Sequence, residues 1–233
     1  MHETTLFPGL VERMKKRRGG RDHIFETLEA GRTALIVVDV QGFFCDPETS
    51  GGQNTIDIVP AVNQLADGVR AAGGTVVWII TTFTEETAQS WSTMFHEFCS
   101  PPVRERLLTG LGPGGWGHAL HPDLVVKPDD LTVEKDRFSP FIAEASTLHA
   151  DLQARGIDTI VVTGTETNVC CESTARDGMM MNYKTIMVSD ANAAHDDNHH
   201  NSALSNVFGF VDVMTTDEVL ARLVRASAQA AAE

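Results

Sequence analysis

Short apolar runs alternate with amphipathic stretches along this chain, and that alternation restricts the fold more than any other feature. Residues 34–39 and 75–81 are rich in β-branched side chains, as expected for strands buried on both faces. Between them, residues 58–72 carry apolar side chains at helical spacing, and this stretch ends at Gly73 and Gly74. The same criteria predict further strands at 131–134, 159–163, 185–189 and 211–214, and further helices at 146–155, 168–181, 198–207 and 217–226.

This repetition of strand and helix predicts a parallel sheet with helices on both faces. We expect an α/β protein whose single domain, residues 33–228, has three layers (α/β/α) around a six-stranded, mostly parallel sheet. Residues 1–32 are predicted to form an N-terminal arm and residues 229–233 a tail. Residues 82–130 are less regular and are expected to be an insertion with a short helix at 103–108.

The charge balance limits the classes of partner. The chain has 18 Lys and Arg against 32 Asp and Glu, a net charge of −14. Nucleic acids and anionic membranes bind positively charged surfaces, so neither is expected as the partner. The arm is the exception, because Lys15, Lys16, Arg17 and Arg18 are adjacent. We expect a solvated arm whose charge, opposite to that of the body, favours contact with a neighbouring subunit in a homo-oligomer, a dimer or tetramer.

Apolar runs and cysteines indicate the compartment. The longest uninterrupted apolar runs are far shorter than the roughly 20 residues that a membrane span needs. The N-terminus lacks the basic start and apolar core of a secretory signal. Four cysteines, two of them adjacent, do not resemble a disulfide framework and suit a reducing cytoplasm.

Chemically capable side chains follow several of the predicted strands. Ligands of open α/β sheets bind beyond the carboxyl ends of the strands. That rule selects Asp39, Thr81 with Thr82, Lys135 and the segment 164–170. An acid, a base and a thiol are therefore expected to converge at one edge of the sheet.

Cys170 is placed early in a predicted helix, with Thr167 or Asn168 as the N-cap. The helix dipole and free N–H groups there favour a thiolate and can bind an oxyanion. Cys171 lies about 100° further round the helix and is expected to face elsewhere. From position alone, a buried packing role for Cys170 is equally open, as are a turn role for Asp39 and a surface ion pair for Lys135.

Histidines offer a competing site. His195, His199 and His200 are the best metal candidates, but the helix-start signal Asp197-Asn198 separates the first from the other two. We therefore predict neither a metal nor a cofactor. A pair of Cys170 with His195 also remains open.

Three motifs carry a resemblance to a known family. The segments ALIVVDVQGFF, TVEKDRFSPF and VVTGTETNVCCESTARDG are similar to those of the isochorismatase-like cysteine hydrolase superfamily. The likeness runs from about residue 34 to 224 and is strongest to its amidohydrolase branch, which includes ureidoacrylate amidohydrolase and N-carbamoylsarcosine amidase. It implies a catalytic triad of Asp39, Lys135 and Cys170. It also implies a cis peptide before Glu166 and an oxyanion hole formed by the N–H groups of Glu166 and Cys170.

The resemblance implies hydrolysis of a C–N bond in a small amide, carbamoyl or ureido substrate, through a thioester. A vinyl-ether hydrolase of the isochorismatase type, or a binding protein without catalysis, are the alternatives. The Asp-x-His stretch that holds the metal of nicotinamidases has no counterpart after the second strand. Candidate substrate-binding residues are Gln41, Phe44, Trp91, Phe138, Phe141, Thr167 and Asn168.

Overall fold

The computed structural model describes residues 2–49 and 51–224, and a central sheet organises them. Its six strands are arranged in the order β4-β3-β2-β5-β6-β7, and every neighbouring pair is parallel. The prediction of an α/β fold with a six-stranded parallel sheet is thus confirmed. The predicted domain end at 228 and the tail 229–233 lie outside the described residues. The strands are β2 (Thr33–Val38), β3 (Thr75–Thr81), β4 (Leu131–Lys135), β5 (Thr159–Thr165), β6 (Lys184–Ala193) and β7 (Asp212–Met214).

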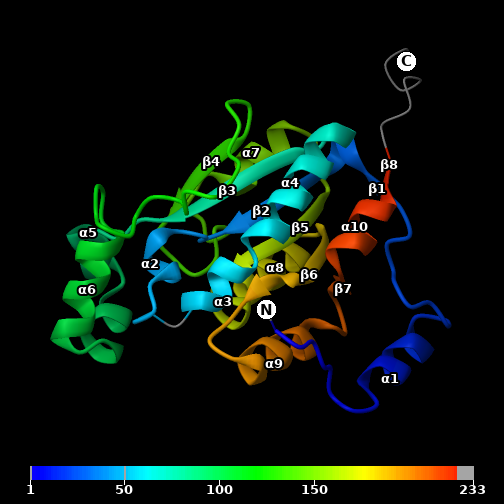
Figure 1. The fold of residues 1–233 in the computed structure, drawn as a ribbon, viewed down its shortest axis with the longest axis horizontal. Coiled ribbons are helices and arrows are strands. Elements are labelled where there is room, and N and C mark those ends of the chain that lie inside the picture. Colours follow the sequence, from blue (N-terminus) through cyan, green and yellow to red (C-terminus); the bar gives the residue numbers. More distant parts are fainter. Residues whose placement is uncertain (1, 50, 225–233) are drawn as a thin grey trace.

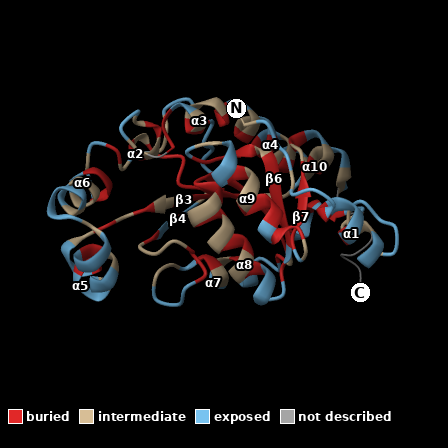
Figure 2. Cartoon of the chain, turned by 90° about the horizontal axis from the view of Figure 1, so that it is seen from below, coloured by how far each residue is buried: buried red, intermediate tan, exposed pale blue. Residues whose placement is uncertain are grey.

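Helices cover both faces of the sheet (Figure 1). On β2, Ile36 and Val38 point to one face, whereas Leu35 and Val37 point to the other, and all are buried. The first face packs against α1 (Leu10–Arg17), α7 (Leu148–Ala154), α8 (Glu172–Met180) and α9 (Asp197–Val207). The second packs against α4 (Val59–Ala72) and α10 (Thr216–Arg222). Most of the sheet is accordingly coloured as buried (red) in Figure 2.

No helix within residues 2–49 and 51–224 is long and apolar enough to cross a membrane.

The insertion is more helical than expected. It contains α5 (Glu85–Ser90), the π-helical η2 (Thr93–Phe98) and α6 (Pro101–Leu111), and α2 (Gly42–Cys45) lies beside them. Thr84 forms a capping box with Thr87 at the start of α5. Pro101 and Pro102 occupy the first turn of α6, where the missing N–H costs nothing. A separate apolar cluster holds this part together, formed by Phe43, Phe83, Ala88, Phe95 and Leu111.

Two predicted helix ends were wrong. The predicted helix 168–181 begins as a π-helical turn, η3 (Thr167–Cys171), and its N-cap is Glu166, without a side-chain cap. Thr167 does not cap because its hydroxyl bonds a histidine ring instead. The last helix ends at Arg222, because Leu223–Val224 (β8) pairs with Leu28–Glu29 (β1). Residues 225 and 226 of the prediction lie outside the part that the structure describes.

The N-terminal arm is largely exposed to solvent, as expected, but it lies against its own domain. Leu10 and Met14 of α1 are buried in the core, while Lys16 and Arg17 stay exposed. After the short β1 strand, the 3-10 turn η1 (Ala30–Arg32) leads the chain into the sheet. Beyond the arm, α3 (Gly52–Asp57) follows β2 and α2 along the chain.

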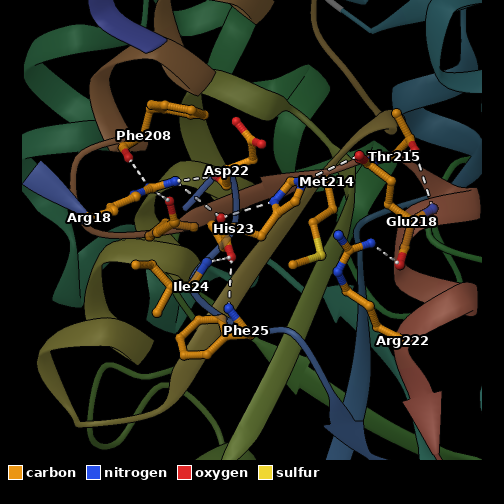
Figure 3. Close-up of polar contacts among 12 residues, drawn as sticks. Arg18, Asp22, His23, Ile24, Phe25, Phe208, Met214, Thr215, Glu218 and Arg222 are labelled. Atoms are coloured by element: carbon orange, nitrogen blue, oxygen red, sulfur yellow. Dashed lines mark hydrogen bonds and ion pairs between the residues drawn. The ribbon is translucent and has the colours of Figure 1, made fainter. Parts of the chain in front are cut away.

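A buried carboxylate fixes the second half of the arm (Figure 3). Asp212 of β7 accepts hydrogen bonds from the backbone N–H groups of Ile24 (2.7 Å) and Phe25 (3.1 Å). The ring of His23 lies between Asp212 and Glu218, at 3.3 Å and 3.2 Å. Buried polar groups need such partners, so these contacts attach the arm to β7 and α10.

Candidate active site

Asp39 directly follows β2 at the carboxyl edge of the sheet. Its side chain is fully buried, and its backbone has φ 53°, a left-handed conformation that is uncommon for residues other than glycine. Such conformations often mark functional sites. On the neighbouring strand only glycine fits at position 164, because a Cβ there would lie 2.1 Å from the carbonyl oxygen of Val38. Gly164 therefore lets β5 approach β2 beside this carboxylate.

Lys135 ends β4 and reaches the same carboxylate. Its side chain is 1% exposed, and Nζ lies 2.8 Å from Oδ2 of Asp39. Nζ also donates to Oγ1 of Thr81 at 2.6 Å, and that hydroxyl donates to Oδ1 of Asp39 at 2.9 Å. Burial lowers the pKa of Lys135, but the interactions with Asp39 and, to a smaller extent, with Cys170 outweigh it and leave the pKa raised. The lysine therefore stays a cation.

Cys170 completes this cluster from the turn after β5. Its Sγ lies 3.6 Å from Nζ of Lys135, and the residue is 7% exposed. Burial raises the pKa of the thiol, Lys135 opposes that effect, and Asp39 adds to it. The structure thus favours a thiol at rest, where the position in the helix had led us to expect a thiolate. A base is needed to ionise it, and a carboxylate lies beside it.

The adjacent cysteine faces a different environment. Sγ of Cys171 points to the carbonyl oxygen of Thr163, at 3.9 Å, and the residue is fully buried. Burial raises its pKa well above the usual value. The two thiols therefore point to different partners, as their separation around the helix predicted.

The backbone before Cys170 has the conformation that the resemblance implied. The peptide bond between Thr165 and Glu166 is cis. The carbonyl oxygen of Glu166 accepts hydrogen bonds from the N–H groups of Val169 and Cys171, both at 3.1 Å. Burial raises the pKa of the Glu166 carboxyl, and the nearby His195 and His199 oppose this. That the N–H groups of Glu166 and Cys170 form an oxyanion hole remains a prediction.

Three of the candidate substrate-binding residues are used by the protein itself. Gln41 donates to the backbone oxygens of Thr81 (3.1 Å) and His118 (2.7 Å), and accepts from the N–H of Thr81. Thr167 is fully buried. Phe141 is buried too, and its ring packs against that of Tyr183, with the centroids 5.5 Å apart. The amide of Gln41 is thus fully engaged within the protein, and all three residues stay predicted substrate contacts.

The other candidates are partly exposed. Phe138 packs against the core cluster that contains Cys170. The centroid of its ring lies 4.9 Å from that of Trp91. Phe44 lies at the insertion, edge-on to Phe43. Oδ1 of Asn168 is buried without a hydrogen-bond partner among the described residues. These four residues also remain candidate substrate contacts.

A surface hollow flanks the site. It has a volume of about 620 Å³ and lies between the start of α5 and residues 142–145. Its wall includes Lys135, whereas Asp39 and Cys170 are not part of the lining. The lining is mostly polar, with Glu134 and Arg137 on its wall. The hollow is therefore adjacent to the buried cluster and does not contain it.

Sequence reasoning did not assign a role to Thr81, although its place at the end of β3 was noted. Its hydroxyl links the lysine and the carboxylate, and a polar residue that ends a buried strand was the available signal. Of the metal candidates, His195 and His199 lie near each other, with ring centroids 6.2 Å apart. His199 also bonds the N-cap Asp196, whereas His200 is buried and bonds Thr167. The described part of the chain contains no group of three or more residues suited to hold a metal ion.

Comparisons with known proteins agree on one family. The isochorismatase domain model matches residues 33–218. The chain is 34% identical over 201 residues to the ureidoacrylate amidohydrolase RutB of Stutzerimonas stutzeri (strain A1501), covering 79% of this chain and 80% of that protein. A cysteine hydrolase from Pseudomonas syringae pv. phaseolicola 1448A has a similar structure, with a TM-score of 0.74 and 31% identity, covering 84% of this chain and 93% of the other. N-carbamoylsarcosine amidase from Thermoplasma acidophilum shares the fold, with a TM-score of 0.63 and 24% identity, over 80% of this chain and 97% of that one.

Proposed function

The chain belongs to the isochorismatase family of hydrolases, and we propose that it is a cysteine-dependent amidohydrolase. Its substrate is a small amide, carbamoyl or ureido compound, from which it releases an amine or ammonia. The observation that carries this proposal is the buried cluster in which Lys135 lies 2.8 Å from Asp39 and 3.6 Å from Cys170. The similarity to a ureidoacrylate amidohydrolase supports the ureido class.

In the first step Asp39 takes the proton of the Cys170 thiol, and the sulfur attacks the substrate carbonyl carbon. Because burial raises the pKa of this thiol, a base must remove its proton while the sulfur forms its bond to the carbonyl carbon. The N–H groups of Glu166 and Cys170 stabilise the negative oxygen of the tetrahedral intermediate. Asp39 then gives the proton to the leaving nitrogen, the C–N bond breaks, and a thioester on Cys170 remains.

In the second step water hydrolyses the thioester. Asp39 takes a proton from the water, whose oxygen attacks the thioester carbon. The C–S bond breaks, and the proton returns from Asp39 to the sulfur. The acid product leaves, and the enzyme is back in its starting state with no net change in charge.

Lys135 and Thr81 hold the carboxylate for both steps. The ammonium offsets the cost of a buried carboxylate and favours the transient thiolate. Thr81 bonds both side chains and thereby fixes their relative position. The partly exposed candidates Phe44, Trp91, Phe138 and Asn168 are among the proposed substrate contacts.

A screen for ammonia release over small amides, carbamoyl amines and ureides tests the proposal. We expect turnover of at least one ureido or carbamoyl compound, and none by Cys170→Ala. Cys45→Ala is the matched control, because Cys45 is also a buried free thiol but lies in α2, and burial raises its pKa to about 11. Cleavage of a vinyl ether without need of Cys170 would favour the alternative reaction, and full activity of Cys170→Ala would refute the proposal.

We further propose that the enzyme is cytoplasmic and forms a homo-oligomer, a dimer or tetramer. The four cysteines are free thiols, which suits a reducing compartment. Large apolar side chains are exposed at the end of α8, where Met179, Met180 and Met181 are 39%, 71% and 38% exposed. Light scattering should give a multiple of 25.3 kDa, and a monomer mass would contradict the oligomer.

A further inference from the structure

The first residues of the arm run along α9. The backbone N–H of Thr5 donates to the side chain of Asn201 at 2.8 Å, and that side chain donates to the carbonyl oxygen of Glu3 at 2.9 Å. The N–H of Phe7 donates to Oγ of Ser205 at 3.0 Å. These bonds join the beginning of the chain to a helix nearly 200 residues away, so they fix the arm against α9 rather than against its sequence neighbours.

The ring of His2 has contacts on its face and at both of its nitrogens. Its ring lies flat on the ring of His200, with centroids 4.4 Å apart and an angle of 17° between the planes. Nδ1 pairs with Oδ1 of Asp197 at 2.7 Å, and Nε2 accepts the N–H of Ala194 at 3.0 Å. The side chain is 3% exposed. Both ring nitrogens thus have partners, and the ring closes the space above His200.

His200 connects α9 to the turn that carries the proposed nucleophile. The residue is fully buried, and its Nδ1 lies 2.9 Å from Oγ1 of Thr167. Thr167 is also fully buried and is the first residue of η3, which ends at Cys171 and contains Cys170. The hydroxyl of Thr167 bonds to the imidazole of His200 and does not cap the helix. The imidazole therefore anchors the start of the turn from outside it.

The protonation of His200 agrees with such a fixed bond. Burial lowers its pKa to about 4, and the nearby ring of His2 acts in the same direction. A backbone contact with Ser189 and the charge of Asp197 act in the opposite direction. At neutral pH the ring is uncharged, so it can share one proton with the hydroxyl without burying a charge.

If the position of His200 served packing alone, an apolar side chain would fill it without the cost of burying a polar imidazole. The hydrogen bond of the imidazole to Thr167 therefore suggests a second role. We propose that His200, held by the stacked ring of His2, is a positioning residue that fixes the nucleophile turn through Thr167. The inference rests on the proposed function, because the position of the turn matters to catalysis only if Cys170 is the nucleophile. Misplacement of a reacting atom by a fraction of an ångström is enough to lower a rate, since attack needs close alignment.

Three variants separate positioning from packing. His200→Phe keeps the ring and its stacking on His2 but removes the bond to Thr167. We expect its kcat to fall about tenfold, while KM changes by less than about twofold. His200→Asn places an amide near the position of Nδ1 and should recover part of the rate. His149→Phe is the matched control, because it removes a histidine–hydroxyl contact of the same 2.9 Å, to Tyr183, away from this turn.

A second readout does not depend on turnover. The rate at which iodoacetamide alkylates Cys170, followed by mass spectrometry, reports the local placement and environment of the thiol. We expect this rate to change severalfold in His200→Phe and in His2→Ala, and to stay at the wild-type value in His149→Phe. His2→Ala keeps the buried core of the protein intact, so it serves as the test if His200→Phe does not fold.

The outcomes distinguish the inference from the proposed function. Wild-type kcat and alkylation rates in a folded His200→Phe, or in His2→Ala, would overturn the inference, even if Cys170→Ala is inactive. Full activity of Cys170→Ala would instead overturn the proposed function. Equal losses in His149→Phe and His200→Phe would mean that the loss of any histidine–hydroxyl contact lowers the rate, and would also overturn the inference.

Discussion

His200 should make the stability of this protein depend on pH. Replacing His200 should remove that part of the pH dependence. Burial lowers the pKa of His200 to about 4, whereas a histidine in an unfolded chain has a pKa of about 6.5. Between these values the unfolded state binds a proton that the folded state does not. Stability is therefore lost as the pH falls from about 6.5 to about 4.

The size of the effect follows from the difference between the two pKa values. That difference is about 2.5, and each pKa unit corresponds to about 1.4 kcal/mol, so His200 costs the folded state about 3 kcal/mol by pH 4. The residue is fully buried, so solvent screening reduces this little. For a protein whose total stability is about 5–15 kcal/mol, such a loss is easily measured.

Urea unfolding, followed by tryptophan fluorescence from pH 7.5 to 4, is the assay. Other groups also titrate in this range, so the wild type is compared with His200→Phe, or with His200→Asn if the first variant does not fold. We expect the free energy of unfolding of the wild type to fall by about 3 kcal/mol more than that of the variant. Equal pH dependence of the two proteins would refute the assignment of His200 as a buried, neutral imidazole.

Other consequences concern the proposed catalytic cluster. Lys135→Met leaves Asp39 buried without its partner and should cost about 3–5 kcal/mol of stability in urea unfolding. Adding Asp39→Asn should restore much of that stability but no activity, and a double variant as unstable as the single one would contradict the ion pair. Cys171→Val should keep most activity in the ammonia assay, because valine has a similar volume, whereas Cys170→Ser should be nearly inactive. Activity should survive EDTA treatment and dialysis, and a loss that zinc or manganese restores would contradict this.

The sheet was predictable because each strand carries its own signal. Buried parallel strands are continuous apolar runs, and residues 75–81 match β3 at both ends. The rule that ligand sites lie at the carboxyl ends of strands selected Asp39, Lys135 and Cys170, and the structure brings these side chains together. Strand periodicity could not assign their roles, which came from the resemblance of three motifs.

What the sequence did not reveal depends on contacts between distant segments. The local composition of the arm is dominated by basic residues and does not show that the arm attaches to its own domain, because this attachment depends on Asp212 and on α9, about 190 residues away. The raised pKa of the Cys170 thiol depends on burial, which the position in a helix does not determine. The short helix predicted at 103–108 starts two residues earlier, at Pro101 and Pro102, because proline is tolerated in a first turn.

Trapping of the acyl-enzyme tests the central claim most directly. A substrate found in the ammonia screen is mixed with the enzyme, the reaction is quenched in acid within the first turnover, and the adduct is located by peptide mapping. Our account predicts an acyl mass on Cys170 and none on Cys171, because only the former lies beside Lys135 and Asp39. An adduct on Cys171, or the absence of any adduct in an enzyme that is turning over, would contradict it.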